Sequence, residues 1–102
     1  MKIIIVGNGK VGFSLAEQLV LEHHDVTIVD LSERSLRQAS DILDIMVVKG
    51  NAVSADTLRE AGAPEADFLV AATSSDEVNM VCCLTAKNLG TKYTTARIRN
   101  PE

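Results

Sequence analysis

The sequence predicts an α/β fold in which short parallel strands, joined by helices, form a β-sheet. Apolar and β-branched runs alternate along the chain with helical segments, and this alternation is typical of parallel strands with crossover helices. The runs are apolar throughout, as expected of parallel strands that are covered on both faces. The predicted strands are residues 3–6, 26–29, 46–48, 68–71 and a weaker last one at residues 93–98.

Size and charge exclude several classes of protein. The chain has 102 residues, 46% of them hydrophobic and 24% charged, which is the composition of one ordinary globular domain over residues 1–102. Its formal net charge of −4 offers no general attraction to DNA or RNA. No apolar run reaches the ~18 residues of a membrane span, and no signal peptide precedes the first strand. We therefore expect a cytoplasmic protein that does not bind nucleic acid.

The first two helices are predicted from the spacing of apolar residues. Between the first two strands, the residues at helical spacing that are expected to face the sheet are Val11, Leu15, Ala16, Leu19 and Val20. The second helix is expected to begin after Ser32, which is a good N-cap. Its inward-facing residues are expected to be Leu36, Ala39 and Leu43.

The last two helices carry start and stop signals. A short helix is predicted at residues 54–61, with Gly62 ending it. The last helix follows the sequence Ser-Ser-Asp-Glu, which matches a capping box with Ser74 as N-cap and Glu77 reaching back to it. Gly90 is expected to end this helix.

Right-handed crossovers leave few topologies for these elements. The common one is a doubly wound, Rossmann-type sheet with strand order 3-2-1-4-5, which binds ligands at the carboxyl ends of the strands, beside the first strand. The sequence offers five strand candidates where the full dinucleotide-binding fold has six, so we expect the sixth strand to be lacking. The chain stops at residues 100–102 without the stop signal of a finished domain, and we expect it to be the front part of a longer protein.

The loop after the first strand has the glycine spacing of a phosphate-binding turn, G-x-G-x-x-G, between a strand and an amphipathic helix. Gly7 permits a sharp turn, Gly9 leaves the backbone open to a pyrophosphate, and Gly12 allows the helix to pack close to the sheet. Free N–H groups and the positive end of the helix dipole would then face the phosphates. The glycines could also make only a tight turn, and Lys10 could be merely solvated. The predicted binding loop is Gly7, Asn8, Gly9, Lys10 and Val11.

Asp30, at the end of the second strand, narrows the expected ligand to NAD(H). It lies 23 positions after Gly7, where an acidic side chain can accept hydrogen bonds from both adenosine ribose hydroxyls. Its charge would repel the 2′-phosphate of NADP, although Arg34, one helical turn further on, could offset part of that repulsion. Asp30 could also serve only as the entry to the next helix. Leu31, beside it, is included in the candidate site.

Two further loops are expected to border the same crevice. After the fourth strand, Thr73 is the better candidate for ligand contact, because Ser74 is at least as well explained by helix capping. After the third strand, Asn51 and Ala52 would flank an adenine, with Ala52 and Val53 offering an apolar edge. A plain turn accounts for this second loop equally well.

The last strand carries two arginines. Arg97 and Arg99 share one face near the carboxyl end of the strand, and therefore near the crevice. They could contact a phosphate or an effector. Charges on an edge strand also serve simply to block aggregation, and the sequence does not decide between the two roles.

The sequence places no catalytic arrangement at the crevice. His23 and His24 precede the second strand, at the opposite end of the sheet from the glycine loop, where they are expected to be solvated. Cys82 and Cys83 are adjacent, which fits neither redox nor zinc-ligand spacing, and we expect them to be buried or half-buried in a helix. We predict no catalytic residue and no metal site, and binding without turnover is the simpler interpretation.

Several segments of the chain match one family together. They are residues 1–12, 48–52, 61–63, 66–67, 72–80 and 96–101, with Asp30. The stretch that holds Asp76, Glu77 and Asn79 and the Ala-Arg-Ile-Arg ending are more specific than the glycine loop. Together these segments resemble the N-terminal domain of the TrkA-type potassium-uptake regulators, the KTN or RCK family, and the similarity covers essentially the whole chain.

The resemblance implies a cytoplasmic regulatory subunit of a membrane potassium transporter or channel, held at the inner face of the membrane through that partner. It also implies homo-oligomers, dimers or higher, that respond to bound NAD(H), or in relatives to ATP and ADP. By position, the pyrophosphate loop corresponds to residues 7–11 and the ribose carboxylate to Asp30. The contacts after the fourth strand correspond to Thr73 and Ser74, and the crevice arginine to Arg97.

Two other functions stay open. An ATP/ADP-sensing domain of the same fold would use the same loop and the same Asp30. The chain could instead be the cofactor-binding half of an NAD-dependent dehydrogenase, although it offers no catalytic pair in favour of that reading. Family members continue with a sixth strand, a crossover helix and often a C-terminal ligand-binding domain.

Overall fold

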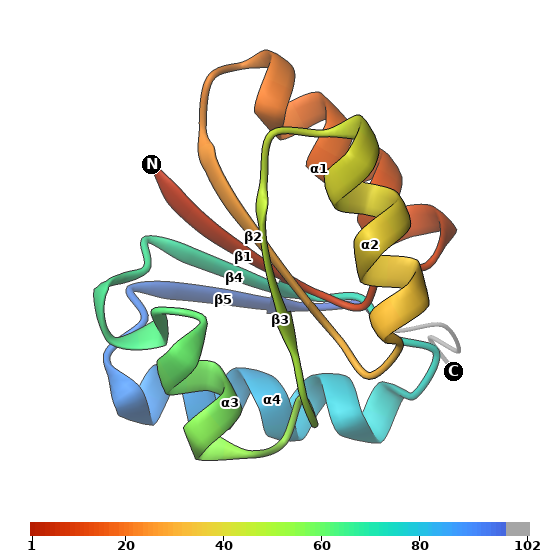
Figure 1. Ribbon diagram of the computed structural model, residues 1–102. Helices are drawn as coiled ribbons and strands as arrows, with labels where there is room; N and C mark the ends of the chain where they lie inside the picture. The colour runs from red at the N-terminus through yellow and green to blue at the C-terminus, as the bar shows by residue number, and fades with distance from the viewer. Residues whose placement is uncertain (98–102) are drawn as a thin grey trace.

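The computed structural model describes residues 1–97 as one parallel sheet with helices on both faces (Figure 1). Its strands are β1 (Lys2–Val6), β2 (Asp25–Asp30), β3 (Met46–Lys49), β4 (Phe68–Ala71) and β5 (Tyr93–Ala96). They pair in parallel in the order β3-β2-β1-β4-β5. The strand order expected for a Rossmann-type sheet is therefore confirmed.

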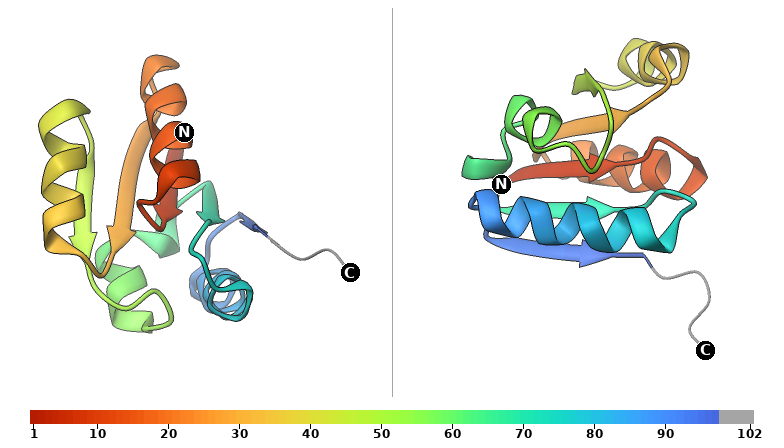
Figure 2. Two further views of the ribbon diagram at one scale, coloured as in Figure 1. Left: turned by 90° about the vertical axis from the view of Figure 1, so that its right-hand side faces the viewer. Right: turned by 90° about the horizontal axis from the view of Figure 1, so that it is seen from below.

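The helices form two layers around this sheet (Figure 2). They are α1 (Lys10–Leu21), α2 (Glu33–Ile42), α3 (Ala55–Glu60), the 3₁₀ turn η1 (Ala63–Glu65) and α4 (Asp76–Leu89). Successive side chains of a strand point to opposite faces, so β1 contributes to two cores. Ile3 and Ile5 pack with α1 and α2, while Ile4 and Val6 pack with α3 and α4. None of the helices in residues 1–97 has the length and apolarity to span a membrane.

The edge strands differ from the expectation of strands that are apolar and covered on both faces. That expectation is confirmed for the centre of the sheet, where residues 3–6 and 26–29 are all buried. In β3, by contrast, Met46 is 62% exposed, and β5 alternates between exposed and half-buried residues. An edge strand lacks a neighbour on one side, and the helices of this domain do not cover its outer face fully.

The apolar spacing predicts the inward face of α1 correctly except in the first turn. The predicted residues that pack against the core as expected include Leu15, Leu19 and Val20. Ala16 is buried as expected, but Val11 is 44% exposed, so its predicted contact with the sheet is wrong. The buried residue of the first turn is Gly12 instead. The first turn lies beyond the carboxyl edge of the sheet, so Val11 reaches the open crevice.

The predicted N-cap is confirmed for α2, but for α4 it is shifted by one residue. Ser32 caps α2 as predicted, because its hydroxyl oxygen accepts a hydrogen bond from the Ser35 N–H at 3.1 Å. The capping box at Ser74 is wrong, since the N-cap of α4 is Ser75, which accepts from the Val78 N–H at 3.2 Å. Adjacent serines are equally good caps locally, and the path of the preceding loop decides between them.

Cys82 lies on the buried face of α4, and Cys83 beside it is half-buried, as expected. Burial, with a smaller contribution from the neighbouring Cys83, raises the pKa of the Cys82 thiol from 9.0 to about 12. The unfolded chain therefore releases this proton at a lower pH than the folded chain does. This difference in pKa contributes in full to the free energy of unfolding below pH 9.0, and the contribution is lost as pH rises toward 12.

We therefore expect the wild-type chain to lose about 1 kcal/mol more of its free energy of unfolding than Cys82→Ala between about pH 8 and pH 10. Urea denaturation of both proteins at each pH measures this difference. The comparison removes the titration of lysines and tyrosine, which both proteins share. Parallel stability curves for the two proteins would contradict the prediction.

Candidate functional site

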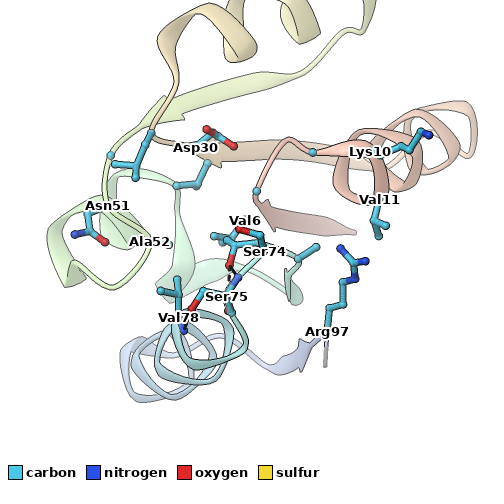
Figure 3. Close-up of a pocket in the computed structure, with 17 residues that line it drawn as sticks. Val6, Lys10, Val11, Asp30, Asn51, Ala52, Ser74, Ser75, Val78 and Arg97 are labelled. Atoms are coloured by element: carbon cyan, nitrogen blue, oxygen red, sulfur yellow. Dashed lines mark hydrogen bonds between the residues drawn. The ribbon is translucent and has the colours of Figure 1, made fainter. Parts of the chain in front are cut away.

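A cavity of about 580 Å³ opens along the carboxyl ends of the strands (Figure 3). This volume is typical of a small-molecule site. All five strand ends contribute to it, because parallel strands end at the same edge of the sheet. The lining residues are Val6, Gly7, Gly9, Lys10, Val11, Val29, Asp30, Leu31, Gly50, Asn51, Ala52, Ala72, Thr73, Ser74, Ser75, Val78 and Arg97.

The structure brings together every residue of the predicted site except Asn8. The Asn8 side chain instead donates two hydrogen bonds to α2, to the Ser35 carbonyl at 2.9 Å and to the Ser35 hydroxyl at 2.7 Å. Its own amide oxygen is buried and has no hydrogen-bond partner among the described residues. Asn8 therefore joins the glycine loop to α2 and does not face the cavity.

Each glycine of the loop has a distinct reason to lack a side chain. Gly7 has φ +102°, a conformation that other residues rarely adopt, and a Cβ there would lie 3.0 Å from the backbone of Ala72 and Thr73. A Cβ on Gly12 would overlap the Gly7 carbonyl oxygen, so close packing of helix against loop requires glycine. A Cβ on Gly9 would meet nothing within 4 Å, because that position faces open space.

The N-terminus of α1 opens on the cavity without a capping side chain. Gly9 is its N-cap and makes no side-chain cap bond, and its first turn contains no acidic residue. The first intrahelical donor is the Phe13 N–H, which bonds to the Gly9 carbonyl at 2.9 Å. The earlier amides have no partner within the helix, and the helix dipole adds a partial positive charge at the same end. This end of α1 is suited to an anion.

Asp30 organises the loop besides facing the cavity. One carboxylate oxygen accepts the Asn8 N–H at 2.7 Å, and the other accepts the Ser32 N–H at 2.8 Å. The sequence allowed Asp30 a role in helix entry or a role in the ligand site, and the side chain has the geometry for both. Each carboxylate oxygen can accept a second hydrogen bond, so acceptor capacity is left for a ligand hydroxyl.

The loop after β3 forms one wall of the cavity. Asn51 and Ala52 line it, and the exposed Leu31 lies at its mouth. The Asn51 side chain accepts the Val53 N–H at 3.0 Å, which closes a local turn. Val53 does not line the cavity, so the apolar edge expected of it is supplied by Ala52 and Leu31.

The loop after β4 forms the opposite wall, and it is held by Asn79 of α4, a residue whose role the sequence did not reveal. Thr73 lines the cavity, but its hydroxyl donates to the Oδ1 atom of Asn79 at 2.6 Å and accepts from the Ser75 N–H at 3.2 Å. Asn79 is completely buried on the inner face of α4, at helical spacing with Cys82 and Ala86. A polar residue at such a position is the signal that would have singled it out.

The charged residues of the cavity are Lys10, Asp30 and Arg97. In Figure 3 the Arg97 side chain extends from the end of β5 toward Val11, across the mouth of the cavity. Lys10 points away from the other labelled side chains. Arg34 does not line the cavity. Arg99, the other arginine expected on this strand, lies outside the described residues.

The histidines lie far from this site, as expected. The His24 ring is 3.2 Å from the N-terminal nitrogen of Met1, at the amino edge of the sheet. His23 stands in the turn between α1 and β2, with φ 65°. The glycine turn and the cavity occupy the carboxyl edge.

A parallel sheet of order 3-2-1-4-5, a glycine turn that opens a helix and a crevice across the strand ends define a Rossmann-type domain. The model of the TrkA-N domain family matches residues 3–102 of this chain. The chain therefore belongs to the TrkA-N domain family.

Individual relatives agree with this membership. The chain is 52% identical over its whole length to the Trk system potassium uptake protein TrkA of Vibrio alginolyticus, of which it spans 22%. Among solved structures it is similar to the AMP-bound Kef CTD of Shewanella denitrificans, with 25% identity, a TM-score of 0.83 and coverage of 98% of this chain and 60% of that one. The GsuK channel bound to NAD shares the fold at 23% identity and a TM-score of 0.85, over 98% of this chain and 18% of that one.

Proposed function

We propose that this domain is a nucleotide sensor, with NAD(H) as its ligand, in a regulatory subunit of a potassium uptake system. The observation that carries the proposal is the convergence of three complementary groups on one cavity. The open N-terminus of α1 suits a pyrophosphate, the Asp30 carboxylate suits ribose hydroxyls, and Arg97 supplies a cation at the mouth. The relatives named above, a potassium uptake protein and an NAD-bound channel, support this ligand and this role.

The proposal includes a mechanism of regulation. Ligand binding shifts the arrangement of paired domains in a homo-oligomer, and that shift opens or closes a membrane potassium transporter or channel. Thermodynamic linkage requires the ligand to bind one arrangement more tightly than the other. We place the protein in the cytoplasm, at the inner face of the membrane through this partner, as the front domain of a longer chain.

We further propose that the domain binds its ligand without catalysis. Among the described residues that line the cavity, the charged ones are Lys10, Asp30 and Arg97. The proposed roles in binding account for Asp30 and Arg97, and Lys10 points away from the other side chains labelled in Figure 3. An NAD-dependent dehydrogenase would also need a group that transfers a proton to or from its substrate. Substrate-dependent oxidation of NADH by the longer protein would contradict this part of the proposal.

NADH is expected to stabilise the chain. At a free concentration of about 100 times Kd, binding adds ~2.7 kcal/mol and raises Tm by about 10 °C for a domain of this size. The Asp30→Asn variant keeps one carbonyl oxygen for the loop but loses the charge, and we expect its Kd for NADH to rise about tenfold. Calorimetry and a thermal melt measure both effects.

Asp67→Asn is the matched control for this experiment. Asp67 also accepts a backbone hydrogen bond, from the Lys2 N–H at 2.8 Å, but it lies at the amino edge of the sheet. Its replacement should change stability without changing affinity. The absence of a thermal shift with NADH, NAD, ATP and ADP alike would contradict the proposed function.

The AMP-bound relative favours an adenine mononucleotide as the second candidate ligand. Asp30 and the glycine loop would hold the ribose and phosphates of ATP or ADP in the same places. Titration of the chain with NADH, NAD, ATP and ADP under one set of conditions distinguishes the two ligands. A Kd for ATP or ADP at least tenfold below that for NADH would assign the domain to ATP/ADP sensing.

A further inference from the structure

Asn79 makes four hydrogen bonds from one completely buried carboxamide. Its Oδ1 atom accepts the Thr73 N–H at 2.9 Å and the Thr73 hydroxyl at 2.6 Å. Its Nδ2 atom donates to the Thr73 carbonyl at 3.2 Å and to the Arg97 carbonyl at 3.0 Å. A carboxamide has two donor hydrogens and two acceptor lone pairs, so this side chain uses its whole hydrogen-bonding capacity.

These bonds join two segments that are 24 positions apart, Thr73 in the β4–α4 loop and Arg97 at the end of β5. Both segments line the cavity, whereas Asn79 does not. The Arg97 N–H also bonds to the Ala71 carbonyl at 2.8 Å, so the end of β5 is held from both sides. The position of the Arg97 backbone, from which its guanidinium reaches the cavity mouth, thus depends on Asn79.

The same hydrogen bonds determine the orientation of the Thr73 hydroxyl group. Its hydroxyl hydrogen is donated to Asn79, and its oxygen accepts from the Ser75 N–H at 3.2 Å. The Thr73 hydroxyl therefore fixes the conformation of the loop, and it holds Ser75 in the position from which Ser75 caps α4. The wall beside the cavity has one arrangement because the buried network is fully satisfied.

We infer that Asn79 is a positioning residue for the ligand of this cavity, which acts by holding Thr73 and Arg97 in the geometry that binding requires. The inference rests on the proposed function, since it concerns the same ligand site. Leucine has a similar size but forms none of the bonds, and aspartate cannot donate to the Arg97 carbonyl when ionised. The carboxamide is the group that meets both demands at this position.

The test compares Asn79→Ala with a control that loses a buried hydrogen bond elsewhere. Thr91 is 2% exposed and donates its hydroxyl hydrogen to the Ala63 carbonyl at 2.7 Å, ahead of β5 and away from the cavity. Calorimetry with NADH on the full chain is expected to give a Kd about tenfold higher for Asn79→Ala. Thr91→Val should bind as tightly as the wild type even where its Tm falls.

Amide hydrogen exchange on the unliganded proteins provides a readout that does not depend on NADH. We expect faster exchange at both Thr73 and Arg97 in Asn79→Ala, and unchanged exchange there in Thr91→Val. If Asn79→Ala does not fold, Asn79→Ser replaces it, because a serine hydroxyl is too short to reach both segments.

The outcomes separate this inference from the proposed function. A wild-type chain that binds none of NADH, NAD, ATP and ADP overturns the proposed function, and this inference with it. A wild-type chain that binds NADH, together with an Asn79 variant of equal affinity or of unchanged exchange at Arg97, overturns the role of Asn79 alone. Additive effects of Asn79→Ala and Thr73→Val on Kd would also contradict it, since residues that act through one another are not additive.

Discussion

Replacing Gly12 with alanine is expected to lower the free energy of unfolding by about 3 kcal/mol. The added Cβ would overlap the Gly7 carbonyl oxygen and lie 3.1 Å from the Gly7 carbonyl carbon, and backbone atoms cannot move aside as the end of a flexible side chain can. Helix propensity alone would favour alanine by about 1 kcal/mol at this position, so the sign of the change distinguishes the two effects. Urea denaturation, with the m-value compared to that of the wild type, measures it.

The steric effect should win because Gly12 is the residue at which α1 approaches the glycine turn most closely. Relief of the overlap would require α1 to move away from β1, and the contact of Ala16 with the core would be lost. An alanine variant as stable as the wild type, or more stable, would show that the helix and the turn do not pack as closely as described.

The second large effect is expected at Gly9, where the same substitution should act on the ligand and not on the fold. A Cβ at Gly9 meets nothing within 4 Å in the protein, and φ is −83°, which alanine adopts without strain. We expect the free energy of unfolding to change by less than about 1 kcal/mol, the usual range for a change of N-cap residue. The Kd for NADH should rise about 100-fold, because the methyl group displaces the phosphates from the open amides of α1.

Gly9→Ala and Gly12→Ala are matched controls for one another. Both add one methyl group to the same loop, one facing open space and the other facing backbone. Calorimetry with NADH and urea denaturation on both variants separates ligand exclusion from misfolding. If Gly9→Ala binds NADH as tightly as the wild type, the pyrophosphate does not approach the N-terminus of α1.

Local patterns in the sequence were sufficient for the elements of this fold. Short β-branched runs, helical spacing and terminal glycines depend on backbone conformation and on which faces are buried, and both act over a few residues. Gly62 and Gly90, at the ends of two helical segments, indeed have positive φ angles of 91° and 125°. Strand order followed from the alternation of elements, because right-handed crossovers leave few choices.

The predictions that were wrong concern positions where two local structures fit the sequence equally well. Ser74 and Ser75 both fit the start of α4. Ser75 is the N-cap because Asn79, six positions further along the chain, holds Thr73 and so fixes the path of the loop. Val11 fits the apolar stripe of α1, but the first turn of that helix projects beyond the sheet. Neither outcome follows from spacing, since each depends on where a distant segment lies.

In the candidate site, too, some features follow from local patterns and others depend on contacts between distant segments. It follows from the sequence that a glycine turn, an acidic residue and an arginine occur at the ends of β1, β2 and β5, and hence that they meet at one edge. The contacts that hold these groups are visible only in the folded chain: two backbone amides bond to Asp30, and the carboxamide of Asn79 bonds to Arg97 and Thr73. The end of a strand can be located from the local periodicity of the sequence, whereas a buried hydrogen bond needs a partner that only chain folding brings within about 3 Å.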